Sequence, residues 1–581
     1  MKTMVTTMFL LCMVLALSPP GYSQSSPVSL VDLPPEILAY PEIVLFNGKI
    51  LVVDEDFSTA EALAIRGENI LSVGDDDRIL KMVGPQTQKF DLEGKTVIPG
   101  LIDTHNHLNR YAIAYMTLLD KGIQWEGEIE TQALVWQEAD MALRDIKRAV
   151  DAASPGEWVR VFTRTPAPLE DLTMSQLDAV SPDHPLVVAQ TISHRPVALN
   201  TKAIEWAQIA PDTPGLPRGG AVMISDRARV VLNQHITWAI PPDKAILWQR
   251  KTMELVNSWG LTMVVTEITP DQFNSLREIW LQDQLTLRWR VGFPGPVDIP
   301  RTGNVSDIGD DWLRISGVWD VEGVGIGFVP GSRAAFGHWT SKVPARANEL
   351  LRWPPARRRL LQALRYGWSV PSSHVQGDIG VRVYLDVIEE AQENPIVKSS
   401  NQRFTMDHME GITDQDIARI KRLGVIPSST MRTIFDDQHP GISAQSSRFQ
   451  EVFGADYVNT MFPLKKYLDM GIHPTVEADA NDEVLGRPLW TIEKAVCRCV
   501  DGSTRIWGKD QKVSRQDALR MKTIWAAAYV GDQKKLGSLE AGKLADLVVL
   551  DKDYMSVPED QISELEVILT IVGGKIVYSR N

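Results

Sequence analysis

The stretch between residues 97 and 528 alternates short apolar runs with polar segments that suit helices. Apolar runs such as "LTMVVTE", "RFTMDH" and "IHPTVEAD" have the length of buried strands, and segments such as "DQDIARIKRL" and "PLKKYLDM" suit helices. Repeated strand-then-helix units favour a parallel sheet, because parallel strands need a long crossover connection. About eight such units favour closure, so we predict an α/β fold in which residues 97–528 form a (β/α)8 TIM barrel.

Two β-rich segments flank this region. Residues 41–96 link short β-branched runs through turns such as "FNGK" and "RGEN", a pattern typical of antiparallel strands. Residues 529–581 have the same character in "LADLVVLDKDYM" and "VILTIVGGKIVYSRN". We therefore predict one small β-sandwich domain built from both chain ends. A chain of 581 residues is long enough to form two domains.

The first 40 residues have a different composition. Residues 1–23 contain the apolar run "MFLLCMVLAL" after a weakly basic start, with Gly21 and Ser23 before a potential cleavage site at Gln24. This pattern predicts a signal peptide, and the run is too short for a stable spanning helix. We expect export to the periplasm or the medium, with 24–40 as a Ser- and Pro-rich linker. The alternative is an N-terminal anchor that stays in place.

The formal net charge of −14 limits the partners. It provides no basic excess to neutralise phosphates, so we expect no nucleic acid and, after signal cleavage, no membrane. The expected partner is a small-molecule substrate, and a homo-oligomer remains open. Outside the leader, the cysteines are Cys497 and Cys499. Their spacing is too short for an easy disulfide, so we expect none and assign them no chemistry.

The sequence "VIPGLIDTHNH" at 97–107 ends an apolar run with two histidines. Residues i and i+2 of a strand point to the same face, so His105 and His107 can converge on one point. Two neutral imidazoles suit a divalent metal such as zinc. The alternative is a surface turn that carries two chance histidines.

Three more polar residues end apolar runs. His374 follows "YGWSVPSS", His408 follows "QRFTMD" and Asp479 follows "IHPTVEA". In such barrels the active site lies at the carboxyl ends of the strands. We therefore expect the four imidazoles and this carboxylate to meet there. The carboxylate can take a proton from a metal-activated water. The remaining histidines lack this context and are interpreted as non-ligands: His184, His235, His338, His439 and His473.

The chain resembles the amidohydrolase superfamily, and within it the amidohydrolase family 3 branch that includes N-substituted formamide deformylases. The motifs that carry the resemblance are "VIPGLIDTHNH", "HRPVALN", "GSRAAF", "HVQGD", "MDHMEGITDQDIARIKRLGV", "VEADAN" and "LGSLEAGKLADLVVLDKDY". They occur in order between residues 41 and 581. The resemblance implies a metal-bearing (β/α)8 barrel beside a small β-sandwich from both termini, in agreement with the patterns above.

The same resemblance implies roles for individual residues. Asp479 would be the catalytic general acid/base and a metal contact, and His194 and Arg333 would contact substrate. The implied metal ligands are His105, His107, His374, His408 and Asp479. The expected cofactor is a divalent metal, most simply Zn²⁺, with one ion favoured and two as the alternative.

One motif departs from the family pattern. Binuclear members carry a lysine that bridges two metals, but this chain has "LRISGVWDVEGVGIGFVPGSRAAF". One alignment places the lysine position near Gly323 and another near Val318 or Trp319, and none of these is lysine. Glu322 lies close by and is the candidate metal bridge, with an ordinary loop carboxylate as the alternative. Weaker substitutes are Asp320 and Glu267.

Together these features predict an exported metal-dependent amidohydrolase that cleaves the carbon–nitrogen bond of an amide or cyclic amide by metal-activated water. One alternative is a metal-assisted lyase, decarboxylase or deaminase on the same barrel, because a fold does not specify its chemistry. The other is a non-catalytic binding relative. Retention of all five donor residues argues against a protein that only binds.

Overall fold

The computed structural model describes residues 40–108, 136–163, 167–190, 196–210, 216, 242–268, 270–294, 303–319, 358, 360–375, 377–394, 397, 402–409, 411–438, 446–447, 449–451, 454–479 and 487–580. The predicted signal peptide at 1–23 lies outside these ranges, as does nearly all of the 24–40 linker. Within the described ranges, none of the helices combines the length and the apolar character needed to cross a membrane.

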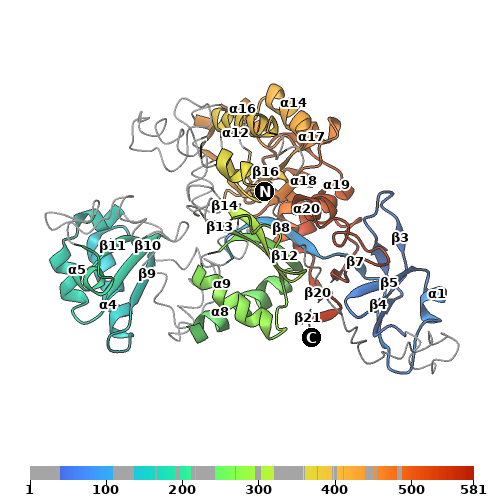
Figure 1. The fold of residues 1–581 in the computed structure, drawn as a ribbon, viewed down its shortest axis with the longest axis horizontal. Helices are drawn as coiled ribbons and strands as arrows, with labels where there is room; N and C mark the ends of the chain where they lie inside the picture. The colour runs from blue at the N-terminus through green and yellow to red at the C-terminus, as the bar shows by residue number, and fades with distance from the viewer. Residues whose placement is uncertain are drawn as a thin grey trace, which may run out of the picture.

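Strands from both chain ends form two sheets that extend from the right-hand side of Figure 1 towards its centre. The first has the order β5-β4-β1-β6, with β1 Ile43–Phe46, β4 Ala62–Arg66, β5 Asn69–Gly74 and β6 Gln88–Asp91. The second has the order β21-β20-β19-β7-β2-β3, with β2 Lys49–Leu51, β3 Thr59–Ala60, β7 Thr96–Pro99, β19 Leu547–Leu550, β20 Val567–Val572 and β21 Lys575–Ser579. Helix α1, Asp76–Leu80, packs on the first sheet.

The second sheet joins the two ends of the chain directly. β19 pairs antiparallel with β7, so that Val548 lies opposite Ile98. One hydrophobic core includes Leu45 from the first sheet with Val97 and Leu547 from the second. Gly573 and Gly574 turn the chain between β20 and β21 with φ of 54° and 72°, which suits a tight hairpin. Burial of apolar side chains from both termini therefore holds the two ends together.

The central part contains two parallel four-stranded sheets. The order of the first is β14-β13-β12-β8, with β8 Leu101–Asn106, β12 Leu261–Glu267, β13 Arg288–Pro294 and β14 Leu313–Trp319. The order of the second is β15-β16-β17-β18, with β15 His374–Val375, β16 Phe404–His408, β17 Val425–Thr430 and β18 Thr475–Glu477. All residues of β12 are buried, as expected for a parallel strand covered on both faces.

The two parallel sheets meet at both edges. Trp319 at the end of β14 forms a parallel bridge with Ser372, just before β15. At the other edge, the backbone N–H of Asp479, just after β18, donates a hydrogen bond of 3.1 Å to the carbonyl of His105 on β8. These contacts bring the carboxyl ends of strands from both sheets to one place.

Helices follow several parallel strands in the chain and flank them in Figure 1. Helix α14 coincides with the predicted segment "DQDIARIKRL": a capping box between Thr413 and Asp416 begins it, and Gly424 with φ of 67° ends it. The helices of this part are α8 Pro242–Ser258, α9 Pro270–Leu281, α12 Gly377–Gln392, α14 Asp414–Leu423, α16 Ala455–Thr460, α17 Leu464–Asp469, α18 Pro488–Cys497, α19 Arg515–Met521 and α20 Ile524–Tyr529.

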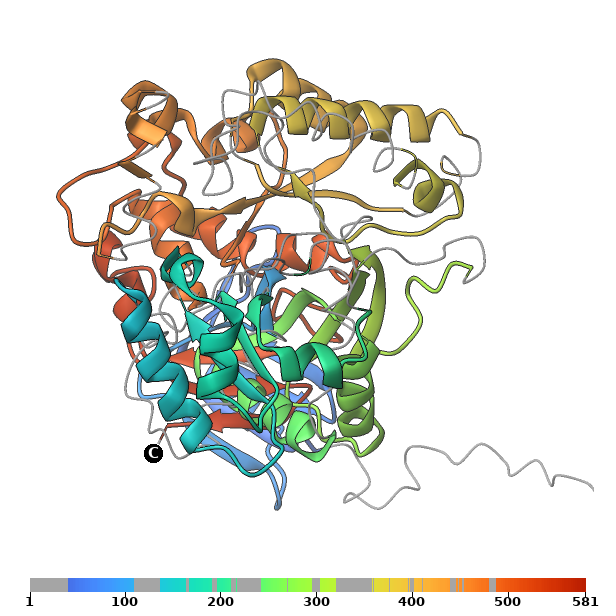
Figure 2. The ribbon, with the colours of Figure 1, turned by 90° about the vertical axis from the view of Figure 1, so that its left-hand side faces the viewer.

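A separate α/β unit lies between β8 and β12 in the chain, at the left of Figure 1 and in front in Figure 2. Its three-stranded sheet has the order β11-β10-β9, and its hydrophobic core includes Val161, Leu177 and Leu186. Its elements are α4 Ala139–Asp151, β9 Val159–Thr163, η2 Ala167–Asp171, α5 Met174–Val180, β10 Leu186–Gln190, β11 Pro196–Leu199 and α6 Thr201–Trp206. The sequence patterns did not separate this unit from the other strand-helix repeats.

The expectation that Cys497 and Cys499 form no disulfide is wrong. Helix α18 ends at Cys497, and Arg498 takes a left-handed conformation with φ of 57°. The chain therefore reverses over one residue and brings the two Cα atoms to 5.1 Å, within the usual disulfide range, and the sulfurs are bonded.

Candidate metal centre

Three of the histidines predicted to be ligands gather around the fourth, His105. The ring centroid of His105 lies 5.1 Å from that of His107, 4.7 Å from His374 and 4.8 Å from His408. Three of the rings are buried and His374 is half-buried. His105 lies in β8, and His107 follows the end of that strand two residues later. β15 and β16 each add one histidine at the same edge. The structure thus brings together side chains that are far apart in the sequence.

Asp479 completes the cluster from the end of β18. Its Oδ1 lies 3.2 Å from Nε2 of His107 and 3.5 Å from Nε2 of His105. Its Oδ2 accepts a hydrogen bond of 2.9 Å from Nη2 of Arg432. Burial raises the pKa of Asp479, but Arg432 and the imidazoles outweigh burial and hold that pKa well below its ordinary range. The carboxylate is therefore ionised, with one oxygen directed at the histidines.

Two buried carboxylates orient the imidazoles from behind. Asp407 Oδ2 lies 3.0 Å from Nδ1 of His105, and Glu477 Oε1 lies 2.9 Å from Nδ1 of His408. When a carboxylate contacts Nδ1 of a histidine, Nε2 of the same ring stays available to bind a metal and becomes more basic. Burial lowers the pKa of His105, but Glu477 and Asp407 outweigh burial and raise that pKa well above its ordinary range.

A third carboxylate has a corresponding position. Oε1 of Glu267, at the end of β12, lies 3.2 Å from Nδ1 of His107. The sequence had suggested Glu267 only as a weak substitute for a bridging lysine. In the structure it contacts the back of a histidine whose Nε2 faces Asp479, which fits an orienting role.

Sequence reasoning missed Asp407, Glu477 and Arg432. The first two left a signal, because each lies within two residues of a predicted site residue at a strand end. Arg432 lies in η4, Met431–Thr433, directly after β17, and a charged side chain at that strand end was also visible in the sequence. Its pairing with Asp479 depends on the neighbouring position of β17 and β18.

Backbone strain occurs at two of the clustered residues. His408 has a φ of 70° and Asp479 a φ of 46°, both in the left-handed region. Such a conformation costs a non-glycine residue about 1–3 kcal/mol and persists only where surrounding contacts enforce it. The cluster thus depends on a backbone held in place by its buried partners.

The donor set fits a divalent metal. Among the described residues, one ligand atom each of His105, His107 and His374 lies within 4.8 Å of the others. Nε2 of His105 is buried and has no hydrogen-bond partner in the part of the chain that the structure describes. Imidazole nitrogens with a nearby carboxylate oxygen are common zinc ligands. The residues present therefore suit the metal that the sequence predicts.

Trp319 occupies the end of β14, one of the two places to which alignment had assigned the missing lysine. Its indole is fully buried and lies 4.9 Å from the His105 ring, centroid to centroid. The candidate bridge Glu322 lies outside the described residues. So do Asp320, Gly323, His194 and Arg333.

Two histidines interpreted as non-ligands are described, and both have other contacts. Nδ1 of His184 lies 3.0 Å from the carbonyl oxygen of Glu157, and His473 stacks on Trp525 at 4.5 Å. His235, His338 and His439 lie outside the described residues.

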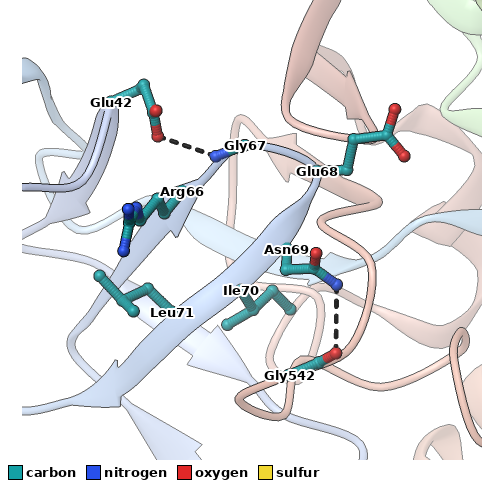
Figure 3. A pocket seen from close by; sticks show the side chains of 8 residues that line it. All are labelled: Glu42, Arg66, Gly67, Glu68, Asn69, Ile70, Leu71 and Gly542. Atoms are coloured by element: carbon teal, nitrogen blue, oxygen red, sulfur yellow. Dashed lines mark hydrogen bonds between the residues drawn. The ribbon is translucent and has the colours of Figure 1, made fainter. Parts of the chain in front are cut away.

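Figure 3 shows a surface pocket elsewhere, between the β4–β5 turn and the loop that contains Gly542. Glu42 accepts a hydrogen bond of 2.8 Å from the backbone of Gly67, and Asn69 donates one of 3.1 Å to Gly542. None of the clustered histidines lines this pocket, so it is not part of the candidate site.

Comparison with known proteins agrees with this geometry. A model described as "Amidohydrolase family" matches residues 88–578. The N-substituted formamide deformylase of Arthrobacter pascens is 24% identical, over 93% of this chain and 98% of its own length. Protein LONG AFTER FAR-RED 3 of Arabidopsis thaliana is 24% identical, over 95% and 94% respectively. A solved uncharacterised metal-dependent hydrolase of Pyrococcus horikoshii shares the fold with a TM-score of 0.66 and 20% identity, over 89% of this chain and 99% of that one.

Proposed function

Because the chain belongs to the amidohydrolase family, we propose that it is a metal-dependent hydrolase that cleaves the carbon–nitrogen bond of an amide or cyclic amide. The observation that carries this proposal is the cluster of four histidines at the carboxyl ends of parallel strands, two of which face Asp479. One full-length relative is named an N-substituted formamide deformylase, so N-formyl compounds are the first substrates to test.

His105, His107 and His374 would hold one divalent ion, proposed to be Zn²⁺, with His408 and Asp479 beside it. Such an ion, when bound, lowers the pKa of a water molecule and polarises a substrate carbonyl. The orienting carboxylates Asp407 and Glu477 would keep the imidazole nitrogens directed into the site.

Asp479 would transfer the proton. Its ionised carboxylate can accept a proton from the attacking water at Oδ1, which faces His105 and His107. The oxygen of that water then forms a bond to the carbonyl carbon. Asp479 delivers the proton to the leaving nitrogen as the carbon–nitrogen bond breaks, so the products are a carboxylic acid and an amine. Arg432 keeps Oδ2 in place throughout.

The finer architecture belongs to the same proposal. The contacts at both edges of the parallel sheets support a closed (β/α)8 barrel over 97–528, interrupted by the α4–α6 unit. The shared core of 41–96 and 529–581 supports a β-sandwich domain. We also propose export through residues 1–23 and substrate contacts from His194 and Arg333, all by sequence alone. A homo-oligomer is compatible with this arrangement.

The decisive experiment incubates zinc-loaded protein with a panel of N-formyl and N-acyl compounds and measures acid and amine together. We expect equal amounts of acid and amine from the wild type and loss of both products in the Asp479→Asn protein. Release of carbon dioxide or ammonia instead would indicate a decarboxylase or deaminase. A metal-loaded protein that binds panel compounds but turns over none would favour the binding relative.

A further inference from the structure

Trp319 forms one wall of the histidine cluster. The His105 ring is surrounded by the rings of His107, His374 and His408 and, at 4.9 Å, by the Trp319 indole. The indole also lies 6.3 Å from the His107 ring and 6.4 Å from the His374 ring. β14 therefore contributes an indole to the site, whereas other strands contribute the candidate metal ligands.

The indole offers no metal ligand. Its nitrogen carries a hydrogen and can only donate. In the described part of the chain, this Nε1 is buried without a hydrogen-bond partner, and the side chain belongs to an apolar cluster with Ile102, Met263 and Val265. Trp319 therefore lies beside the central histidine, His105, with a side chain that offers no metal ligand.

Neighbouring strands hold this side chain in place. A methyl group added at Gly292 on β13 would lie 2.9 Å from Cβ of Trp319 and 3.3 Å from its Cε3. Glycine at that position leaves the space that the indole fills. The backbone of Trp319 is also bridged to Ser372, whose hydroxyl lies 2.8 Å from Nδ1 of His105. Trp319 and His105 are therefore held in place by contacts to the same residue, Ser372.

The Nδ1 atoms of His105 and His408 already have partners. The described residues offer a second potential triad of His105, His408 and Glu477. However, Nδ1 of His408 and Oε1 of Glu477 face each other at 2.9 Å, and Nδ1 of His105 faces Asp407 at 3.0 Å. A second ion that used these Nδ1 atoms or Glu477 Oε1 would have to displace these buried contacts.

We infer that Trp319 limits the metal centre to one divalent ion per chain, an inference that rests on the proposed function. A second ion needs several ligand atoms at about 2.0–2.3 Å, and the indole fills the side from which another ligand would approach. The role of Trp319 is to determine metal stoichiometry.

The test is metal content by elemental analysis, after equilibration with excess Zn²⁺ and removal of free ion. The wild type is expected to hold one ion. The Trp319→Glu protein, in which a carboxylate replaces the indole, is expected to hold two. Trp319→Phe keeps an aromatic wall and should hold one. Trp289→Phe, a buried tryptophan of β13 in a different core cluster, is the matched control and should also hold one.

Two results would overturn the inference while leaving the proposed function intact: two tightly held ions in the wild type, or one ion in a Trp319→Glu protein that melts cooperatively. No ion in the wild type would instead contradict the proposed metal centre itself. Glu322→Gln should still hold one ion. A fall from two ions in the wild type to one in that variant would show that Glu322, rather than the indole, controls stoichiometry.

A fluorescence titration keeps the inference testable if Trp319→Glu does not fold. Co²⁺ added to metal-free wild type should quench tryptophan emission and saturate at one equivalent. The quenching should be smaller in Trp319→Phe and unchanged in Trp289→Phe. Saturation at two equivalents, or equal quenching in both variants, would overturn the inference.

Discussion

Arg432 donates a hydrogen bond of 2.9 Å from Nη2 to Oδ2 of Asp479, and both side chains are largely buried. This contact leaves Oδ1 of Asp479 as the oxygen that faces the histidines. It joins the end of β17 to the end of β18, where the proposed proton transfer takes place.

Replacing Arg432 with methionine should lower kcat about 10- to 100-fold while metal content stays unchanged. The reason is that Asp479 keeps its place beside the histidines but loses the partner that orients its carboxylate. Arg432→Lys restores a charge and should recover part of kcat. Loss of metal in the methionine variant would show that Arg432 supports the whole cluster rather than one carboxylate.

Asp479→Asn should retain metal and lose about two to four orders of magnitude in turnover, the scale expected for removal of a general base. Asparagine keeps the shape of the side chain but cannot take a proton. Metal analysis and steady-state kinetics on the same preparation check this. Asp469→Asn, on the exposed end of α17, is the control and should match the wild type. Turnover near wild type in Asp479→Asn would remove Asp479 from the mechanism.

His105→Ala and His107→Ala should each abolish metal binding and turnover in a protein that still melts cooperatively. Both imidazoles lie beside Asp479 Oδ1, so each removal deletes a ligand at the centre of the cluster. His473→Ala removes a histidine that stacks on Trp525 instead, and it should keep its metal. Full metal content in His107→Ala would disprove the ligand assignment.

Asp407→Asn should weaken zinc affinity about 10- to 100-fold, the usual effect of losing a carboxylate behind a histidine ligand. Asp407 holds Nδ1 of His105 and accepts hydrogen bonds from Tyr529 and the Ser373 backbone. Competition with a chromophoric chelator measures the affinity. Unchanged affinity would mean that the packing around His105 alone fixes its ring.

Asp532 should contribute stability that disappears in acid. It accepts hydrogen bonds of 2.7 Å from Arg290 and 2.8 Å from Arg314. Burial raises the pKa of Asp532, but the two guanidinium groups outweigh burial and lower it below its ordinary value. A lowered folded-state pKa stabilises the protein above the unfolded value of about 3.9, and that stabilisation falls away as pH drops through the folded value.

The measurement is the difference in Tm between the wild type and Asp532→Asn as a function of pH. The variant should melt well below the wild type at pH 7, because Arg290 is left buried with a weaker partner. The gap should shrink below about pH 4, where the carboxyl of the unfolded chain begins to protonate while that of the folded protein is still ionised. A gap that is constant from pH 7 to pH 3 would show that packing, not charge, accounts for it.

Local sequence was sufficient for the features that depend on a few neighbouring residues. The two-residue spacing of His105 and His107 already placed both imidazoles on one face of a strand. The segment "DQDIARIKRL" also coincided with α14, which a capping box at Thr413 begins and Gly424 ends in the structure. Strand-end positions likewise picked out His374, His408 and Asp479, because polar groups at the ends of apolar runs are visible without knowing which strands are neighbours.

Tertiary structure decided everything that depends on which elements meet. The pairing of Arg432 with Asp479, the carboxylate of Glu267 behind His107 and the wall formed by Trp319 each join segments separated by tens to hundreds of residues. Such contacts depend on the order and register of parallel strands, and a short apolar run carries no information about its neighbour. The α4–α6 unit escaped notice for the same reason: its strand-helix pattern resembles that of the parallel strands, and only pairing shows that β8 lies against β12 instead.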